Sequence, residues 1–304
     1  MIPRRLGADA TGFLTVPIIG APSKAERVNP LITSLKNPRV QEAVRLRAGR
    51  QRRKRGCCLI EGTRELQRAA RAGVRWREVF ACQPLCDHPA ARELIDQLLA
   101  GRVPLHWVTP EVYEKLAYGQ RSEGILAVAQ TPHRTLAELP LSSCPLVAVL
   151  EGVAKPGNVG AVIRTADAAA VDAVILADAA TDLYNPNAIR ASLGTIFTLP
   201  VSTASAIETR AWLQQHGLQV LAARVDAQPA YTQVDFTRPT AIVLGSESSG
   251  LSAVWQAGQV TPVRLPMRGV ADSLNVSAAA AVLLFEAARQ RDAAAERADG
   301  SGAP

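Results

Sequence analysis

Aromatic residues are scarce in this 304-residue chain: Phe, Trp and Tyr make up 4% of it, although 48% of the residues are hydrophobic. Alanine and valine supply much of the apolar content, which is typical of a close-packed α/β protein. No hydrophobic run approaches the length of a membrane span. Pro17 interrupts the short apolar stretch 13–19, which argues against a signal peptide. We therefore expect a cytoplasmic protein with no membrane contact.

Cysteine is infrequent as well, with five residues in all and no C-x-x-C pair. Cys82, Cys86 and His88 lie close together in the sequence, but a second pair of zinc ligands is missing. Free thiols in a reducing compartment are the expected state, and we predict no metal site.

Two nucleotide-binding signatures are missing too. The chain contains neither G-x-G-x-x-G nor G-x-x-x-x-G-K-[ST]. The first absence argues against a nicotinamide-dependent oxidoreductase, and the second against a P-loop nucleotide hydrolase.

Positive charge is in excess, with a net charge of +7 and a pI near 9.5, which favours a polyanionic partner such as nucleic acid. It is concentrated at 45–55, RLRAGRQRRKR, where seven residues are basic. A charge run is often only a solvated surface, but the single sign and the density favour contacts with phosphate. The predicted phosphate-binding residues are Arg50, Arg52, Arg53, Lys54 and Arg55.

The chain divides into five segments. Residues 1–30 show no periodicity and are predicted to be a flexible arm. Residues 31–130 start with a helix at Asn37-Pro38 and then alternate strands and helices, which predicts a compact α/β unit. Residues 131–145 contain three prolines and are predicted to be a linker. Residues 146–291 form a second α/β domain, with a strand expected at 197–201 and a long helix at 277–291, and 292–304 a disordered tail.

Three strands of the second domain each lead into a polar or glycine-rich loop. The apolar strand 146–150 leads to a helix for which Asn158 is the expected N-cap and which carries Arg164. The strand 241–244 leads to Gly245–Gly250, and the strand at 263–265 leads to 266–275. Ligands of open α/β sheets bind at the carboxyl ends of strands, so the loops are expected to form one ligand site.

These loops carry three motifs: N-x-x-x-x-x-R at 158–164, G-x-E-x-x-G-L-S at 245–252 and P-M-x-G-x-x-x-S-L-N-V-S at 266–277. With them the sequence resembles the SpoU-type (TrmH family) RNA 2′-O-ribose methyltransferases of the SPOUT class over residues 147–290. The first domain resembles the ribosomal-protein-like RNA-binding domain that precedes the catalytic domain in many members. Glu123 is a departure, since the family more often has glutamine before Gly124-Ile125.

The resemblance implies an α/β fold whose C-terminal SPOUT domain contains a deep trefoil knot, preceded by a smaller α/β RNA-binding domain. It also implies S-adenosylmethionine as methyl donor and a homodimer with an active site shared between subunits. The catalytic residues that it implies are Asn158, Arg164, Glu247, Ser273 and Asn275. The cofactor-binding residues are expected to be Leu244, Gly245, Glu247, Gly250, Leu265, Met267, Ser273 and Leu274.

Roles follow from side-chain chemistry. A guanidinium is almost never a base, so Arg164 is expected to bind an RNA phosphate and to stabilise the developing alkoxide. Glu247 is expected to fix Asn158 or a loop backbone. The function expected by resemblance is 2′-O-methylation of 23S rRNA, and the alternatives are a tRNA 2′-O-methyltransferase and a non-catalytic RNA-binding protein of the same fold. The sequence identifies neither the target nucleotide nor a housekeeping or antibiotic-resistance role.

Overall fold

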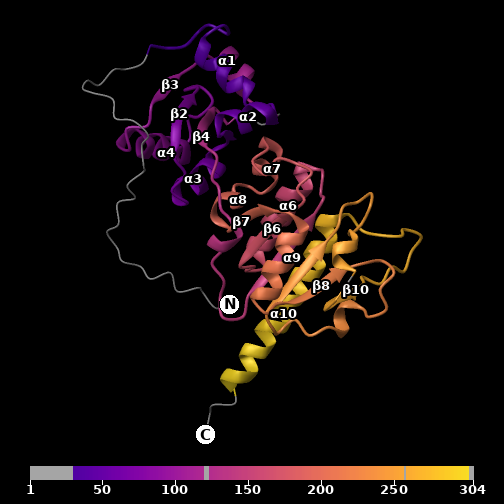
Figure 1. Ribbon diagram of the computed structural model, residues 1–304. Coiled ribbons are helices and arrows are strands. Elements are labelled where there is room, and N and C mark those ends of the chain that lie inside the picture. Colours follow the sequence, from indigo (N-terminus) through magenta and orange to yellow (C-terminus); the bar gives the residue numbers. More distant parts are fainter. Residues whose placement is uncertain (1–29, 120–122, 257, 301–304) are drawn as a thin grey trace.

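The computed structural model describes residues 30–119, 123–256 and 258–300. Two α/β units follow each other along the chain, coloured indigo to magenta and magenta to yellow in Figure 1. Nearly all of the predicted flexible arm, 1–30, lies outside the described residues. The predicted linker at 131–145 contains a short 3₁₀ helix, Leu136–Glu138, and its leucines pack against the second unit.

The first unit contains a four-stranded sheet in the order β1-β4-β2-β3, in which only β2 and β3 are parallel. Asn37 caps its first helix by accepting a hydrogen bond from the Arg39 N–H, and Pro38 occupies the first helical position, as predicted. Its elements are α1 (Pro38–Arg45), α2 (Gly49–Arg55), β1 (Cys57–Glu61), α3 (Thr63–Arg71), β2 (Trp76–Ala81), α4 (Pro89–Ala100), β3 (Leu105–Trp107), α5 (Pro110–Leu116) and β4 (Ile125–Gln130).

The second unit contains a parallel six-stranded sheet in the order β10-β8-β9-β5-β6-β7. Its elements are β5 (Leu146–Glu151), α6 (Pro156–Ala168), β6 (Ala173–Ala177), α7 (Pro186–Ala191), α8 (Thr195–Thr198), β7 (Val201–Ala204), α9 (Ala206–Gln215), β8 (Gln219–Ala223), β9 (Thr240–Leu244), β10 (Val260–Val263) and α10 (Val276–Gly300). Two further 3₁₀ turns are Tyr231–Gln233 and Ala253–Trp255.

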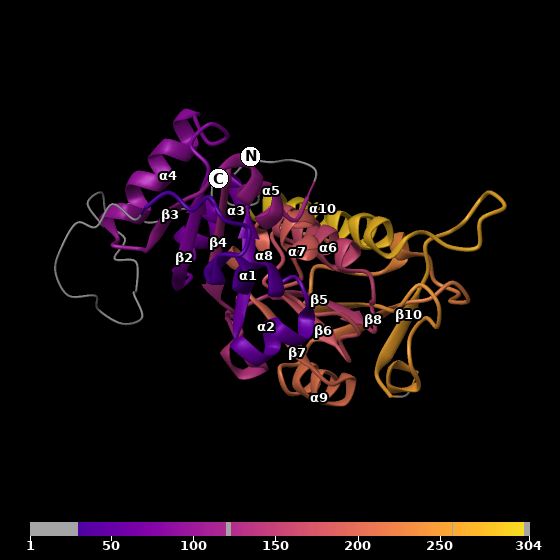
Figure 2. The ribbon, with the colours of Figure 1, turned by 90° about the horizontal axis from the view of Figure 1, so that it is seen from above.

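Helices cover both faces of the parallel sheet. Figure 2 shows α6, α7 and α10 on one side of the strands and α9 on the other. Strand β5 alternates accordingly: Ala148 and Leu150 join the core beneath α6 and α10, whereas Val147 and Val149 join the core beneath α9. A sheet buried on both faces explains why its strands read as short, nearly continuous apolar runs.

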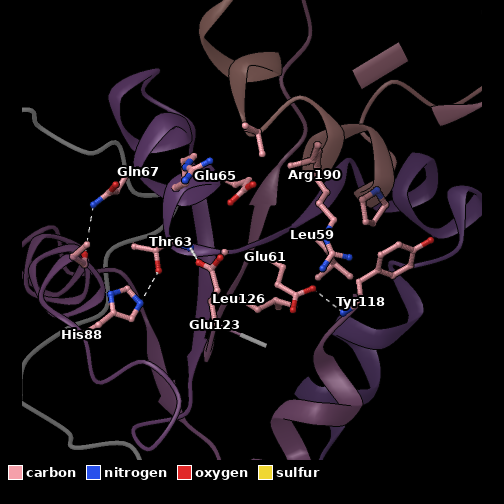
Figure 3. A pocket seen from close by; sticks show the side chains of 16 residues that line it. Leu59, Glu61, Thr63, Glu65, Gln67, His88, Tyr118, Glu123, Leu126 and Arg190 are labelled. Carbon is pink, nitrogen blue, oxygen red and sulfur yellow. Dashed lines mark hydrogen bonds between the residues drawn. The ribbon is translucent and has the colours of Figure 1, made fainter. Parts of the chain in front are cut away.

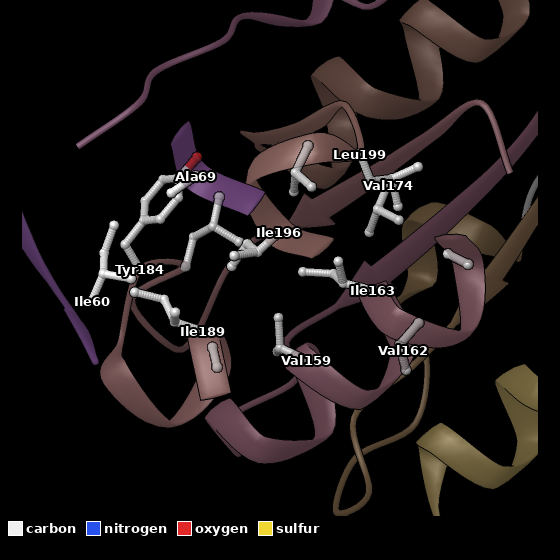
Figure 4. Packing of buried hydrophobic residues seen from close by; sticks show 14 of the residues in the cluster. Ile60, Ala69, Val159, Val162, Ile163, Val174, Tyr184, Ile189, Ile196 and Leu199 are labelled. Atoms are coloured by element: carbon white, nitrogen blue, oxygen red, sulfur yellow. The ribbon is translucent and has the colours of Figure 1, made fainter. Parts of the chain in front are cut away.

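The two units share one hydrophobic core. Figure 4 shows Ile60 of β1 and Ala69 of α3 packed in the same cluster as Ile189 of α7 and Ile196 of α8. Gly194, at φ +83°, lets the backbones approach closely, because a Cβ there would lie 2.9 Å from the Cα of Glu65. The contact therefore fixes one unit against the other.

Two sequence predictions were wrong in detail. The strand expected at 197–201 starts only at Val201, because residues 195–198 form helix α8, in which Thr195 and Thr198 each donate a side-chain hydrogen bond to a carbonyl three residues earlier. The tail expected to be disordered from Asp292 continues helix α10 as far as Gly300. Its alanine-rich sequence has high helix propensity, which explains the continuation.

Candidate active site at the ends of three strands

The first two loops are tied together by Glu151, the last residue of β5. Its side chain is 4% exposed, and its carboxylate accepts hydrogen bonds from the Ser252 N–H at 2.8 Å and the Ser252 hydroxyl at 2.6 Å. Sequence reasoning missed this residue, although an acidic residue that ends an apolar strand was a visible signal. Glu151 thereby holds the loop after β9 against the end of β5.

Asn158 connects all three predicted loops. Its amide donates to Glu247 Oε1 in the loop after β9, and its Oδ1 accepts from Asn275 Nδ2 in the loop after β10, at 3.4 Å. The prediction that Glu247 fixes Asn158 is therefore confirmed. Asn158 is not an N-cap as expected: Pro156 starts α6 and Lys155 occupies the cap position, which places Asn158 inside the first turn.

Arg164 lies away from this network. It is exposed, and among the described residues it forms no hydrogen bond or ion pair. Six residues along a helix correspond to a rise of about 9 Å and a rotation of about 120° from Asn158, so the two side chains leave α6 on different sides. Within one chain, the structure does not bring Arg164 into the cluster of Asn158, Glu247 and Asn275.

The loop after β9 folds back on itself. Ser246 and Gly250 exchange backbone hydrogen bonds of 3.2 and 3.1 Å, and a Cβ on Gly245 would lie 2.4 Å from the carbonyl of Gly250. Gly250 adopts φ +63°, a conformation that favours glycine. Leu244 differs from the prediction, because its side chain is 2% exposed and belongs to the core. It follows that only its backbone is available to a ligand.

The loop after β10 carries the remaining predicted residues. It projects beyond the edge of the sheet in Figure 2. Leu265 and Met267 are half-buried, Ser273 is exposed and Leu274 is 43% exposed. The exposed side chain of Leu274 therefore offers apolar surface to a ligand or to another chain.

The predicted basic surface is divided by burial. Arg52 is 3% exposed and pairs with Asp182 of the second unit at 2.7 Å, so its expected role in phosphate binding was wrong. Arg55 pairs with Glu42 at 3.4 Å, and Arg50, Arg53 and Lys54 are exposed. One face of α2 thus holds the two units together, while the other faces solvent with unpaired positive charge.

The cysteines are free thiols, as predicted, and four of the five are buried. Burial raises the pKa of Cys58 to about 12, so this thiol stays protonated and unreactive. In the described part of the chain, no group of three or more His, Cys, Asp or Glu side chains could hold a metal ion. None of the described helices is long and apolar enough to cross a membrane.

Comparisons with known proteins agree with this architecture. Residues 145–285 match the model of the SpoU rRNA methylase family, and residues 37–127 match an MRM3-like substrate-binding domain. The 23S rRNA (uridine(2479)-2′-O)-methyltransferase of Streptomyces viridochromogenes is 32% identical, with 86% of this chain and 92% of that protein covered. The 23S rRNA (guanosine(2553)-2′-O)-methyltransferase RlmP of Bacillus subtilis is 26% identical, with 84% of this chain and 97% of that protein covered.

Solved structures are similar over nearly the same length. The crystal structure of an RNA 2′-O ribose methyltransferase superposes with a TM-score of 0.76 at 40% identity and covers 86% of this chain and 99% of that one. An AdoMet-bound rRNA methyltransferase from Sinorhizobium meliloti superposes with a TM-score of 0.78 at 25% identity, covering 85% of this chain and 97% of that one.

Proposed function

The chain belongs to the SpoU rRNA methylase family, and from this premise we propose that it transfers the methyl group of S-adenosylmethionine to a ribose 2′-hydroxyl of 23S rRNA. Two relatives named as 23S rRNA 2′-O-methyltransferases and an AdoMet-bound neighbour support this activity. The observation that carries the proposal is the hydrogen-bonded cluster of Asn158, Glu247 and Asn275, which joins three strand ends into one site.

The residues at this site fit an adenosine-bearing methyl donor. Gly245 and Gly250 have no side chains, so their backbone N–H and C=O groups are open to a ligand. Aliphatic surface for a base is offered by Leu265, Met267 and Leu274. S-adenosylmethionine supplies an electrophilic methyl group when bound. Glu247 holds Asn158 in one orientation at the mouth of α6, while Ser273 and Asn275 position the target nucleotide.

Arg164 is proposed to act on the RNA. Its guanidinium stays charged, so it binds a phosphate and stabilises the alkoxide that develops at the 2′-oxygen, and it does not remove the proton itself. Because Arg164 is exposed and apart from the cluster of its own chain, we propose that it completes the site of a second copy.

An exposed apolar stripe supports the homodimer. Leu274, Val282 and Phe285 are 43%, 37% and 51% exposed, and the spacing of Val282 and Phe285 places them on one side of α10, the helix that packs against α6. A second copy placed on this stripe would cover it and bring its own α6 to the site. We also propose the trefoil knot. The chain path supports it, because β10 lies at one edge of the sheet and the chain then returns so that α10 packs on α6 and β9.

Replacing Phe285 with aspartate should convert the dimer to monomers and abolish methyl transfer, since a charge would be buried at the centre of the apolar contact. Sedimentation velocity measures the assembly state, and circular dichroism checks that the monomer is folded. Val225→Asp is the matched control, because Val225 is 69% exposed and lies outside α6 and α10. A Phe285→Asp variant that sediments like the wild type would contradict this interface.

Replacing Arg50, Arg53 and Lys54 together with alanine should weaken RNA binding and lower its salt dependence. On a plot of the logarithm of the binding constant against the logarithm of the salt concentration, each phosphate contact contributes about 0.9 to the slope. This value is that of B-DNA and serves as a guide for duplex RNA. A loss of up to three contacts should therefore reduce the slope by roughly two to three. Arg71, Arg102 and Arg297, which are exposed as well, provide a control of equal charge when changed to alanine, and an equal loss of slope there would contradict a localised RNA surface.

The activity itself is tested with methyl-labelled S-adenosylmethionine and separate pools of unmodified rRNA and tRNA. Label in rRNA that resists alkaline hydrolysis at one linkage is the expected result, because a 2′-O-methyl group blocks that cleavage. Label in tRNA alone would mean that the substrate is tRNA and not rRNA. Label in neither pool would support a non-catalytic RNA-binding protein.

We also propose that the protein is located in the cytoplasm, because the RNA substrate is there.

A further inference from the structure

A cavity of 470 Å³ lies between the two units, on the far side of α7 from the proposed active site. Figure 3 shows side chains of both units around it: Glu61 at the end of β1, Thr63 at the start of α3, Glu123 before β4, Tyr118 after α5 and Arg190 of α7. This volume lies in the range of small-molecule sites. Its lining combines carboxylates with apolar walls, and the proposed function so far does not use it.

Carboxylates are concentrated on one side of the cavity. Glu65 is 7% exposed, and its Oε2 lies 2.5 Å from the position that a Cβ of Gly62 would take, while Glu123 Oε2 lies 3.5 Å from the same position. Two acceptor groups therefore share a small space. Burial, together with the charge of Glu123, raises the pKa of Glu65.

Glu61 adds a third acceptor. Its Oε2 accepts the Tyr118 N–H at 2.8 Å, and its Oε1 is buried with no hydrogen-bond partner among the described residues. Burial raises the pKa of Glu61 as well. Glu61 Oε1 has almost no accessible surface, so it does not itself contact a ligand, but the Glu61 carboxyl adds to the acceptor character of the cavity wall.

Apolar side chains and two arginines, Arg64 and Arg190, complete the cavity. Leu59, Leu126 and Ile189 are buried at its walls, next to the ring of Tyr118. The guanidinium of Arg190 lies directly over Gly119, where a Cβ would be 1.6 Å from Nη1. The cavity therefore offers apolar contact, carboxylate acceptors and two arginine side chains.

We propose that this cavity binds an unstacked guanine base of the RNA substrate, an inference that rests on the proposed function. Carboxylates repel phosphates, so a base edge is the part of RNA that can enter. Guanine is the one standard base whose Watson–Crick edge presents two adjacent N–H donors, N1–H and N2–H, which match the two oxygens of a carboxylate. Its faces are bound by the apolar walls, as unpaired RNA bases are commonly recognised.

The position of α7 relates this base to the methylated nucleotide. Ile189 and Arg190 face the cavity, whereas Ala188 and Ala191 contact Gly160 of α6, two residues from Asn158. One helix, with a diameter of about 10 Å, therefore separates the cavity from the cluster of Asn158, Glu247 and Asn275. The guanine is accordingly placed near the target nucleotide and not at it.

The test is binding of guanosine 5′-monophosphate to the full-length protein by equilibrium dialysis. Guanosine monophosphate should bind about tenfold more tightly than inosine, adenosine, cytidine or uridine monophosphate, because inosine lacks the N2 amino group and the others lack the adjacent donor pair. Glu123→Gln should remove this preference, since an amide keeps an acceptor for the Thr63 N–H, now at 2.8 Å from Glu123 Oε2, but loses the charge. Glu114→Gln, an exposed carboxylate outside the cavity, is the matched control.

The same variants separate this inference from the proposed function. In the methyl-transfer assay, Glu123→Gln should raise the KM for RNA several-fold and leave kcat and S-adenosylmethionine affinity unchanged. Active enzyme with equal affinity for all five monophosphates would overturn the guanine site alone. Preferential binding of guanosine monophosphate without methylation of any RNA would instead overturn the proposed function. Displacement of guanosine monophosphate by spermidine at equal concentration would identify a general cation site and would also overturn the inference.

Discussion

Replacing Arg164 with alanine should lower the rate of methyl transfer about a thousandfold, the loss typical of removing one charged donor from a developing oxyanion. Affinity for S-adenosylmethionine should change little, because Arg164 is apart from the loops that would hold the cofactor. The prediction depends on the electrostatic role of the guanidinium. Arg164→Lys should therefore recover only part of the rate, since an ammonium keeps the charge but loses the planar array of donors.

Single-turnover kinetics with labelled S-adenosylmethionine measure this loss, and equilibrium dialysis measures cofactor affinity. Arg297→Ala serves as the control, because Arg297 is an exposed arginine on α10. Full activity of Arg164→Ala would contradict the assigned role. A parallel fall in cofactor affinity would mean that Arg164 belongs to the cofactor site instead.

Mixed dimers test whether the site is shared. Arg164→Ala and Asn275→Ala should each be nearly inactive as homodimers. In a mixture, one site of each heterodimer receives an intact Asn158, Glu247 and Asn275 cluster from one copy and an intact Arg164 from the other. Activity should therefore return to about a quarter of the wild-type value, if copies exchange at random and sites act independently. No recovery in a mixture whose exchange is demonstrated would contradict a shared site.

Local patterns predicted most of the fold because the relevant forces act over short sequence distances. The apolar runs at β5 and β9 are required wherever a parallel sheet is covered on both faces, and Asn37-Pro38 is a local start signal for α1. The convergence of the three loops was predictable for a similar reason. Parallel strands end at the same edge, so Asn158 and Glu247 had to be neighbours once the sheet order placed β9 beside β5. Asn275 was less predictable, because β10 lies at the edge of the sheet and Asn275 reaches the cluster only as the chain returns to α10, which packs on α6.

What sequence could not supply is the environment that distant segments create. Leu244 and Arg52 stand in segments that predict a ligand surface, yet both side chains are buried. The burial of Arg52 depends on Asp182, which lies 130 residues later in the chain. The interdomain cavity is equally non-local, since its carboxylates come from β1, α3 and the loop before β4, and its opposite wall from α7. Charge density along the sequence therefore identifies a surface but not the residues in it that face solvent.

Replacing Arg52 with alanine should destabilise the protein by about 3–5 kcal/mol, the cost of removing one partner from a buried ion pair. The substitution leaves the carboxylate of Asp182, which is 17% exposed, without its charged partner. It also removes the donors to the carbonyls of Leu46 and Arg47, which lie 2.8 and 2.7 Å from Arg52 Nη1. Chemical denaturation monitored by tryptophan fluorescence measures the loss.

Arg53→Ala is the decisive comparison, because Arg53 is the next residue of α2 but is exposed. The Arg53→Ala variant should keep a free energy of unfolding within about 0.5 kcal/mol of the wild-type value but bind RNA more weakly. The Arg52→Ala variant, studied at a low temperature at which it is folded, should bind RNA with an affinity closer to that of the wild type. The double variant Arg52→Met, Asp182→Leu should recover part of the lost stability, since it removes both charges at once. An Arg52→Ala protein that is as stable as the wild type but binds RNA more weakly would contradict this prediction. It would mean that Arg52 contacts RNA and that the shared apolar core alone holds the two units together.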